Sequence, residues 1–590
     1  HRYWFDYDEP TPANGYYYAR LRQVNFQCGY ETYYPTVIQW GANDYGSYGS
    51  SQCHSISVTG GSASDFEGKI KFTGDLNGDG FTDVILYRPD RNGEKTAAFY
   101  INKGESADGT LTFEKHPNTI ELDDNIDWIY TMDLNGDGLD DVVLSNRKRT
   151  FIGKDKLTVA SYLSSVDSNG SYHFTLVPQS FDEFKIKKKY KETILVGDFL
   201  GEGRQSILLQ ECEDSKAAPR LFYISYLNGA LSSQQLPSSM VLDADRMFAC
   251  DFNGDGISEI YFMDEDTEST GLKRMVRSGS SYSYQTVNSN MLSPWHQIFP
   301  GDFNGDGKPD LLTYVEDGHG NASWHLNYFM ESRMRWPAFD MGEQVVGIGN
   351  PGTHGYSLKY FDEPDYKFIT VGDFNGDGKA DVAVRTQNDQ MRFLYGPLRN
   401  VNGEGQFAGS QTVGLSDIGM SGVSNQTICT GNFLGRENMS LFSATTVYSL
   451  NPVSNRYSVT AVTDGMGNRT EFEYDYLMPK PSGASDADFY TRTVQTVSEQ
   501  AAHMFTVPLP MKGMSKMACH NVNCQSPVAE VTYRYSNALV HKRGRGFLGF
   551  KAVTTENWLA STKQQSADRS SETLFNVPFL ALRTENVKSG

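Results

Sequence analysis

Hydrophobic and polar residues alternate over short stretches along most of the chain, which is the pattern of β-strands. Brief apolar runs such as Val84–Leu86 and Val382–Val384 are separated by segments rich in Gly, Asn and Asp, which favour turns. Apolar residues spaced three and four positions apart, as in an amphipathic helix, are nearly absent. The sequence therefore predicts an all-β fold.

An acidic loop between two such strands indicates a metal site. From Asp373 to Asp381, oxygen-bearing side chains occupy positions 1, 3, 5 and 9, and Gly378 permits the sharp turn after the third of them. Ca²⁺ takes about six to eight oxygen ligands in proteins, which an alternating Asp/Asn loop is suited to supply. An EF-hand needs flanking helices and a Glu at position 12, whereas short β-branched segments flank this loop. The loop therefore predicts a Ca²⁺ site between two strands.

The loop recurs about every 50 to 70 residues, beginning at residues 75, 133, 198, 251, 302, 373 and 432. Five copies are complete and predict about five Ca²⁺ sites. Their metal ligands are Asp75, Asn77, Asp79 and Asp83; Asp133, Asn135, Asp137 and Asp141; Asp251, Asn253, Asp255 and Glu259; Asp302, Asn304, Asp306 and Asp310; and Asp373, Asn375, Asp377 and Asp381. In the other two copies Leu200 and Arg436 replace ligands, which argues against metal there.

Units of this length with about four strands each have the size of propeller blades. The repeats therefore predict a seven-bladed β-propeller, with six blades plus one orphan motif as the alternative. We divide the chain into β-strands before the propeller (residues 1–42), the propeller (43–455) and a β-rich segment in which the loop no longer recurs (456–590). A closed propeller brings its first and last blades together, so we expect residues 1–42 and 456–590 to share one sheet.

Two stretches have the composition of loops. Residues 43–65 contain many Gly and Ser and are expected to form a connector or an exposed loop. Residues 507–518 contain Pro, Gly, Ser and Met and are expected to form part of a long loop.

Charge and motifs exclude several classes of function. The formal net charge is -20, from 52 Lys and Arg against 72 Asp and Glu, which argues against a nucleic acid or an anionic membrane as partner. No apolar run is long enough to cross a membrane, so we expect no transmembrane segment. No nucleophile elbow, zinc-protease helix or phosphate-binding loop occurs, so we predict no catalytic residues and no organic cofactor.

Smaller signals leave alternatives open. Cys519 and Cys524 are close enough in sequence for a local disulfide, with free thiols or zinc as alternatives. The sequence opens at His1 without a signal peptide, so we expect a processed product or a fragment. Four histidines between two of the loops lack the spacing of a zinc site: His296, His319, His325 and His354.

The motifs resemble known families. The Gly-Asp-Phe-Asn-Gly-Asp-Gly loops resemble the FG-GAP/VCBS calcium repeats of integrin α-subunit propellers and of many bacterial surface proteins. In the flanks, Asp464–Thr470 is similar to a turn of Rhs/YD repeats, and Tyr533–Phe550 is similar to the segment after the propeller in the SpvB/TcB family of toxin-complex proteins. Arg2–Tyr7, Arg20–Arg22 and Pro35–Trp40 resemble the segment before it.

In that family, the propeller is inserted between strands of a large β shell that encloses a toxic C-terminal cargo. The resemblance implies that residues 1–42 and 456–590 are pieces of such a shell, and that most of the shell and any toxin lie outside this chain. It implies a bacterial protein, secreted or on the cell surface, that is a non-enzymatic scaffold. Its propeller would close the shell or dock another protein, either a component of a secretion or toxin complex or its own cargo.

The sequence leaves two other functions open. An adhesin or lectin would bind glycan or protein with the propeller face, and the chain's many Tyr and Phe residues suit stacking against sugars. An enzyme such as a polysaccharide lyase would carry its active site on the propeller.

Overall fold

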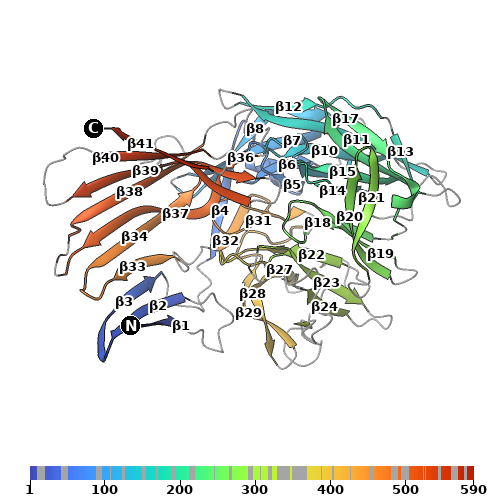
Figure 1. The fold of residues 1–590 in the computed structure, drawn as a ribbon. Coiled ribbons are helices and arrows are strands. Elements are labelled where there is room, and N and C mark those ends of the chain that lie inside the picture. The colour runs from blue at the N-terminus through green and yellow to red at the C-terminus, as the bar shows by residue number, and fades with distance from the viewer. Residues whose placement is uncertain are drawn as a thin grey trace.

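The computed structural model of the chain consists almost entirely of β-strands (Figure 1). It describes residues 1–589 except for 9–19, 42–50, 88–95, 107, 122–125, 149–153, 168–170, 182, 188–193, 212–218, 243, 245, 265–268, 290–296, 304, 306, 317–321, 328–345, 348–368, 387–388, 402–403, 425–426, 451–457, 480–488, 493–503, 523, 525, 542–545, 560–568 and 577–580. The helical elements of the described residues are two short 3-10 helices, η1 (Ala63–Phe66) and η2 (Ser238–Met240). The predicted all-β fold is confirmed.

Strands from both ends of the chain form one twelve-stranded sheet, called here the terminal sheet. Its order is β1-β2-β3-β33-β34-β37-β38-β39-β40-β41, and β35 and β36 also pair with β38. The strands are β1 (Arg2–Asp8), β2 (Arg20–Cys28), β3 (Glu31–Trp40), β33 (Val459–Thr463), β34 (Arg469–Leu477), β35 (Tyr490–Thr491), β36 (Met504–Val507), β37 (Leu509–His520), β38 (Ala529–His541), β39 (Gly546–Leu559), β40 (Arg569–Asn576) and β41 (Ala581–Ser589).

The two ends of the chain meet where β3 pairs with β33. The pairing is antiparallel, with Val37 opposite Thr463 and Ile38 opposite Val462. Figure 1 shows the blue strands β1–β3 beside the orange strand β33. The predicted pairing of the segment before the repeats with the segment after them is confirmed.

Between these segments, each acidic loop joins the first two strands of a repeated unit; the units are numbered 1 to 7 along the chain. Unit 1 contains β5 (Ile70–Gly74), β6 (Asp83–Tyr87), β7 (Thr96–Glu105) and β8 (Leu111–Glu121). Unit 2 contains β9 (Ile126–Met132), β10 (Asp141–Lys148), β11 (Lys154–Val166), β12 (Tyr172–Leu176) and β13 (Glu183–Lys187). Unit 3 contains β14 (Ile194–Gly197), β15 (Ser206–Glu211), β16 (Arg220–Leu227) and β17 (Ala230–Gln235).

The later units follow the same plan. Unit 4 contains β18 (Arg246–Cys250), β19 (Glu259–Asp264), β20 (Ser269–Ser278) and β21 (Ser281–Ser289). Unit 5 contains β22 (Gln297–Gly301), β23 (Asp310–Glu316), β24 (Ala322–Asn327) and β25 (Val346–Gly347). Unit 6 contains β26 (Ile369–Gly372), β27 (Asp381–Thr386), β28 (Gln390–Val401) and β29 (Glu404–Gly414). Unit 7 contains β30 (Cys429–Gly431), β31 (Ser440–Ser443), β32 (Thr446–Leu450) and, from much earlier in the chain, β4 (Ser51–Thr59).

The prediction of a connector or an exposed loop at residues 43–65 is wrong for β4. This strand pairs antiparallel with β32 of unit 7 and parallel with β8 of unit 1, so the two units form one eight-stranded sheet. His54 and Ile56 are buried on one face of β4 while the residues between and beside them are more exposed, an alternation that the Ser-rich composition hides.

The loop predicted for residues 507–518 is also wrong. Leu509–His520 forms β37, which pairs antiparallel with β34 and β38. Most of its residues are half-buried, so pairing with two neighbours stabilises a strand whose Pro510 and Gly513 disfavour one locally.

The hydrophobic core of the repeat region lies between neighbouring units. Every residue of β6 and β15 is buried, because a further unit packs on each face of these strands. Phe66 and Val84 of unit 1 pack with Phe433 and Phe442 of unit 7 in one cluster. Burying a Phe or Leu side chain contributes about 1.5–3 kcal/mol, so these contacts hold adjacent units together.

Candidate metal loops

The first aspartate of each loop organises the turn through its carboxylate. Asp133 accepts hydrogen bonds from the amides of Gly136 (2.6 Å) and Gly138 (2.8 Å), and the loops of units 4 and 6 repeat this pair. Gly136 and Gly138 have φ angles of 82° and 88°, in the left-handed region that glycine enters without steric cost. The Asp and Gly positions therefore fold the loop together.

The ninth position of the loop is a buried clamp as well as a predicted ligand. The Asp141 carboxylate accepts the amide of Leu134 at 2.9 Å and the amide of Ser164, on the third strand, at 2.8 Å. Asp83 makes the equivalent two bonds in unit 1, at 2.9 and 2.7 Å. Both carboxylates are fully buried. They tie the loop to the rest of its unit.

Burial disfavours the charged form of several loop carboxylates. Burial and, to a smaller extent, the Asp79 carboxylate beside it raise the pKa of Asp75 to about 8. Burial likewise raises the pKa of Asp79 to about 6 and that of Asp373 to about 8. Buried acidic groups that share a site disfavour one another's charged form, and a bound dication would relieve this. The predicted ligands are all oxygen atoms, and a Ca²⁺ ion would supply the positive charge that these buried carboxylates need.

The carboxylates are nonetheless oriented toward the backbone. Among the described residues, no group of three or more His, Cys, Asp or Glu side chains has a metal-holding arrangement. In unit 2, Asp137 accepts the amide of Leu139 (3.0 Å), and Asn135 accepts the amide of Asp137 (2.8 Å). The loops thus have the predicted donors in the predicted order, and Ca²⁺ binding there stays a prediction.

Several predicted or considered residues lie outside the described part. In unit 5, Asp302 and Asp310 make the usual contacts, with Gly305 and Phe303 among their donors, whereas residues 304 and 306 fall outside. Of the four histidines, His325 lies in β24 and residues 296, 319 and 354 are outside.

Cys519 and Cys524 are free thiols rather than a disulfide.

Each of the two loops that lack ligands carries an arginine in an ion pair. In unit 3, Arg204 lies 2.7 Å from the Glu202 carboxylate and donates to the carbonyl oxygen of Tyr226 at 2.8 Å. In unit 7, Arg436 pairs with Glu105 of unit 1 at 2.8 Å. A fixed cation at each loop gives a physical reason to expect no metal there.

Amide hydrogen bonds between successive loops were not anticipated from the sequence. The residue just before the ninth position donates its amide to the carbonyl of the first-position residue in the preceding unit. These bonds are Asp140 to Asp75 (2.9 Å), Gln205 to Asp133 (2.7 Å), Ser258 to Asp198 (2.8 Å), Ala380 to Asp302 (2.7 Å), Met439 to Asp373 (2.6 Å) and Thr82 to Asn432 (2.9 Å). The last joins unit 1 to unit 7. Between units 4 and 5 the donor position holds Pro309, which has no N–H.

A glycine before the loop allows these units to approach. In five units the residue preceding the first ligand is Gly74, Gly197, Gly301, Gly372 or Gly431. A Cβ atom at Gly431 would lie 2.6 Å from Cγ2 of Thr82 in unit 1, too close for real side chains. The motif's glycine therefore has a packing role that becomes visible only when neighbouring units are assembled.

The loops of units 1 and 7 also contact the terminal sheet. A Cβ at Gly80 would lie 2.5 Å from Pro508, which separates β36 from β37, and one at Gly78 would lie 2.9 Å from the Arg492 guanidinium. Lys512 of β37 pairs with Glu437 of unit 7 at 3.1 Å. The propeller region is thus docked on the sheet through its loop edge.

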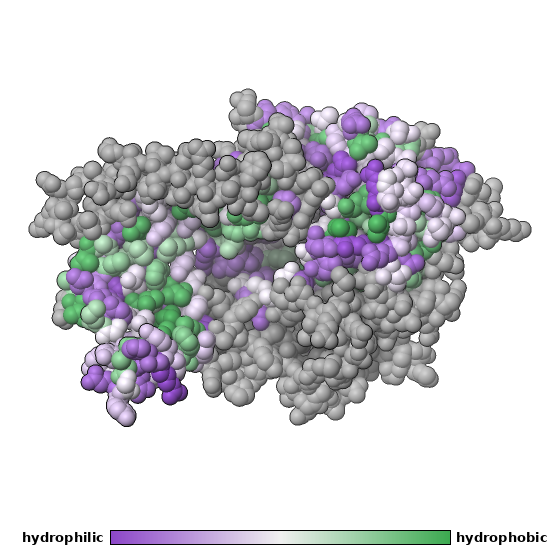
Figure 2. Space-filling view, viewed as in Figure 1, coloured by the Kyte–Doolittle hydropathy of each residue, from purple (hydrophilic) through white to green (hydrophobic). Residues whose placement is uncertain are grey.

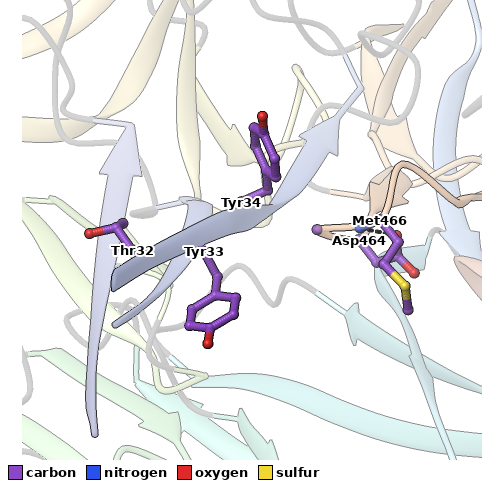
Figure 3. Close-up of a pocket in the computed structure, with 6 residues that line it drawn as sticks. Thr32, Tyr33, Tyr34, Asp464 and Met466 are labelled. Carbon is purple, nitrogen blue, oxygen red and sulfur yellow. Dashed lines mark hydrogen bonds between the residues drawn. The ribbon is translucent and has the colours of Figure 1, made fainter. Parts of the chain in front are cut away.

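The terminal sheet carries exposed hydrophobic residues. On the face drawn in Figure 2, hydrophobic residues gather over this sheet, at the left. A shallow pocket lies between the start of β3 and the β33–β34 turn, and Figure 3 shows Tyr33 and Tyr34 pointing to opposite sides of β3. Its one carboxylate, Asp464, accepts bonds from Met466 and Asn468, which lower its pKa, the Asn468 side chain contributing most. That carboxylate shapes a turn.

Family models match both parts of this arrangement. FG-GAP-like repeats match residues 75–144 and 251–313, and an FG-GAP repeat matches residues 368–405. The middle/N-terminal region of the insecticide toxin TcdB matches residues 415–577. The first two matches support a class for the repeat region, a β-propeller of FG-GAP repeats. The TcdB match then extends the likeness into the terminal sheet: the chain holds an FG-GAP propeller within a Tc toxin-like protein.

Solved structures align over nearly the whole chain at low similarity. The crystal structure of TcdB2–TccC3–Cdc42 has 15% identity and a TM-score of 0.46, with 98% of this chain and 23% of that chain covered. The Tc holotoxin pore of Photorhabdus luminescens has 13% identity and a TM-score of 0.39, with 98% and 28% covered. The chain thus spans about a quarter of the length of these structures. No curated protein sequence matches the chain.

Proposed function

We propose that this chain is a non-enzymatic scaffold of a secreted, toxin-complex-like bacterial protein. The observation that carries the proposal is the β3–β33 pairing, which makes the propeller region an insertion between strands of one continuous sheet. The TcdB match over residues 415–577 supports the same assignment. In this role the propeller docks a protein partner or closes a β shell around a cargo, and the terminal sheet is part of that shell.

We further propose that the propeller has seven blades. The support is the series of inter-loop amide bonds, interrupted by Pro309 between units 4 and 5, in which the Thr82 amide of unit 1 reaches Asn432 of unit 7. Strand β4 supports the same closure, because it pairs with both of these units. In a six-bladed ring with unit 1 or unit 7 as the orphan, these two units would not be joined in this way.

Calcium is proposed as the structural ion of the complete loops. Their aspartate and asparagine side chains would hold it, and the ion would supply positive charge among carboxyl groups whose pKa burial raises. Binding to the native state stabilises it by mass action. The carboxylate at the fifth position of each loop would turn from its amide donor toward the ion.

The adhesin alternative has less support. A lectin face needs exposed aromatic rings for stacking, and among the described residues Trp128 is the one strongly exposed aromatic in the repeat units. Its ring already contacts Phe72 edge to face. The most exposed tyrosines, Tyr30 and Tyr34, lie on the terminal sheet instead.

Two observations test the scaffold assignment. Glycan-array binding and polysaccharide turnover by the purified chain, with Ca²⁺ and with EGTA, are expected to be negative; glycan binding would favour the adhesin, and calcium-dependent turnover an enzyme. The gene's complete reading frame is expected to continue beyond Gly590 into YD repeats. A frame without such repeats contradicts the shell assignment.

A further inference from the structure

The loop of unit 4 differs from the other complete loops at its last ligand. Glu259 stands at the ninth position, where the others have Asp. One Glu259 carboxylate oxygen accepts the amide of Phe252 at 3.1 Å, which reproduces one half of the clamp seen at Asp141. The other oxygen, 3.5 Å from Arg274 Nε, does not make the usual bond to a third-strand amide in any described contact.

Arg274 lies across from this ligand on the third strand of the unit. Ile260 of β19 pairs with Lys273 of β20, so the next position along the register sets Glu259 opposite Arg274. Opposed residues of an antiparallel pair project to the same face of the sheet. By the same register, the positions opposite the ninth ligand in units 1, 2 and 6 hold Ile101, Leu163 and Tyr395.

The Arg274 guanidinium joins two of the predicted metal ligands. Its Nη2 contacts Oδ2 of Asp255, and its Nε lies 3.5 Å from Oε1 of Glu259. The Arg274 side chain is 19% exposed and that of Glu259 2%, so their contact is largely shielded from water, whereas the Asp255 side chain is 39% exposed. An arginine remains charged at any physiological pH, and its planar group spans carboxylates on two sides.

We infer that the loop Asp251–Glu259 is closed by Arg274 in place of Ca²⁺, so that the chain holds four ions rather than five. The inference rests on the proposed calcium role of the other four complete loops. A dication in this loop would have to displace a tethered cation from two of its four ligands, against the repulsion of like charges. Units 3 and 4 then share one device, an arginine paired with the carboxylate at the fifth loop position, whereas units 1, 2, 5 and 6 depend on metal.

Counting Ca²⁺ per full-length chain tests the inference, by native mass spectrometry with elemental analysis at saturating Ca²⁺. We expect Arg274→Gln to gain one ion over the wild type. The matched control, Lys273→Gln, removes the neighbouring charge and should gain none. Asp251→Asn in the wild-type background should lose none, whereas Asp302→Asn should lose one. The combination of Asp251→Asn with Arg274→Gln should abolish the gain.

An unchanged count in Arg274→Gln, or the loss of an ion in Asp251→Asn, would overturn the inference. The Asp251→Asn result decides the matter even if Arg274→Gln folds poorly. A wild-type count of zero would overturn the wider calcium proposal, and a gain of one ion in Arg274→Gln would still support the role of Arg274. The two ideas therefore fail in different ways.

Discussion

Replacing Gly431 by alanine will weaken the contact that joins unit 7 to unit 1. Gly431 does not have a positive φ, so alanine is compatible with its backbone and the effect is steric. The added methyl would lie 2.6 Å from Cγ2 and 2.8 Å from Oγ1 of Thr82. Thr82 makes two hydrogen bonds to Asn432, one from its amide (2.9 Å) and one accepted by Oγ1 (2.8 Å), and both must shift.

The expected loss follows from these contacts. Overpacking costs about 1–3 kcal/mol, and each hydrogen bond contributes about 0.5–1.5 kcal/mol. Together they give a local destabilisation of about 2–6 kcal/mol. Since about 1.4 kcal/mol corresponds to a factor of ten, amide exchange through local opening should accelerate roughly 30-fold to 10⁴-fold.

Hydrogen–deuterium exchange with mass spectrometry on the full chain measures this at peptides that contain Thr82 and Asn432. Thr82→Ala removes the two atoms nearest the new methyl, so the double variant with Gly431→Ala should recover at least half of the loss. Peptides of β38 and β39, in the terminal sheet, serve as the internal control. Unchanged exchange in Gly431→Ala, or a double variant that is worse than either single one, refutes the reasoning.

Three further outcomes are expected. Calorimetry should show a higher melting temperature in excess Ca²⁺ than in EGTA, and equal temperatures would contradict a structural ion. Asp302→Ala and Asp373→Ala should each lose one bound ion while Asp198→Ala loses none; equal losses at all three would contradict the ligand assignment. Gly80→Ala should expose β36 to protease, because its methyl would meet the terminal sheet, whereas Gly29→Ala, also at positive φ but with open space around it, should not.

Local sequence patterns determine much of this fold. The run Val84–Leu86 is apolar because β6 is buried on both faces, and the Asp and Gly positions of the loop fold through bonds within nine residues. Features that depend on a distant partner could not be predicted in this way. Strand β4 has too little apolar sequence to be recognised before units 1 and 7 lie beside it.

The candidate metal loops likewise combine local features, which the sequence predicts, with features that depend on distant residues. The order of the oxygen donors is a local property and is readable, whereas the effect of Arg274 depends on the strand register that sets it opposite Glu259. The glycine of each loop is visible in the motif, but the reason for Gly431 is Thr82, some 350 residues away in sequence. Burial also overrides composition in β37, where Pro510 and Gly513 point to a loop.

The most direct test of the account is a disulfide between β3 and β33, because the central claim is that one sheet contains the chain before and after the propeller. Both pairs are made in a Cys519→Ser background, because the native Cys519 lies opposite Thr470. Ile38→Cys with Val462→Cys places thiols at directly opposed positions, whereas Ile38→Cys with Thr470→Cys places them two strands apart. Peptide mapping after mild oxidation should find the first cross-link and not the second. Absence of the first cross-link, or equal formation of both, would contradict an inserted propeller.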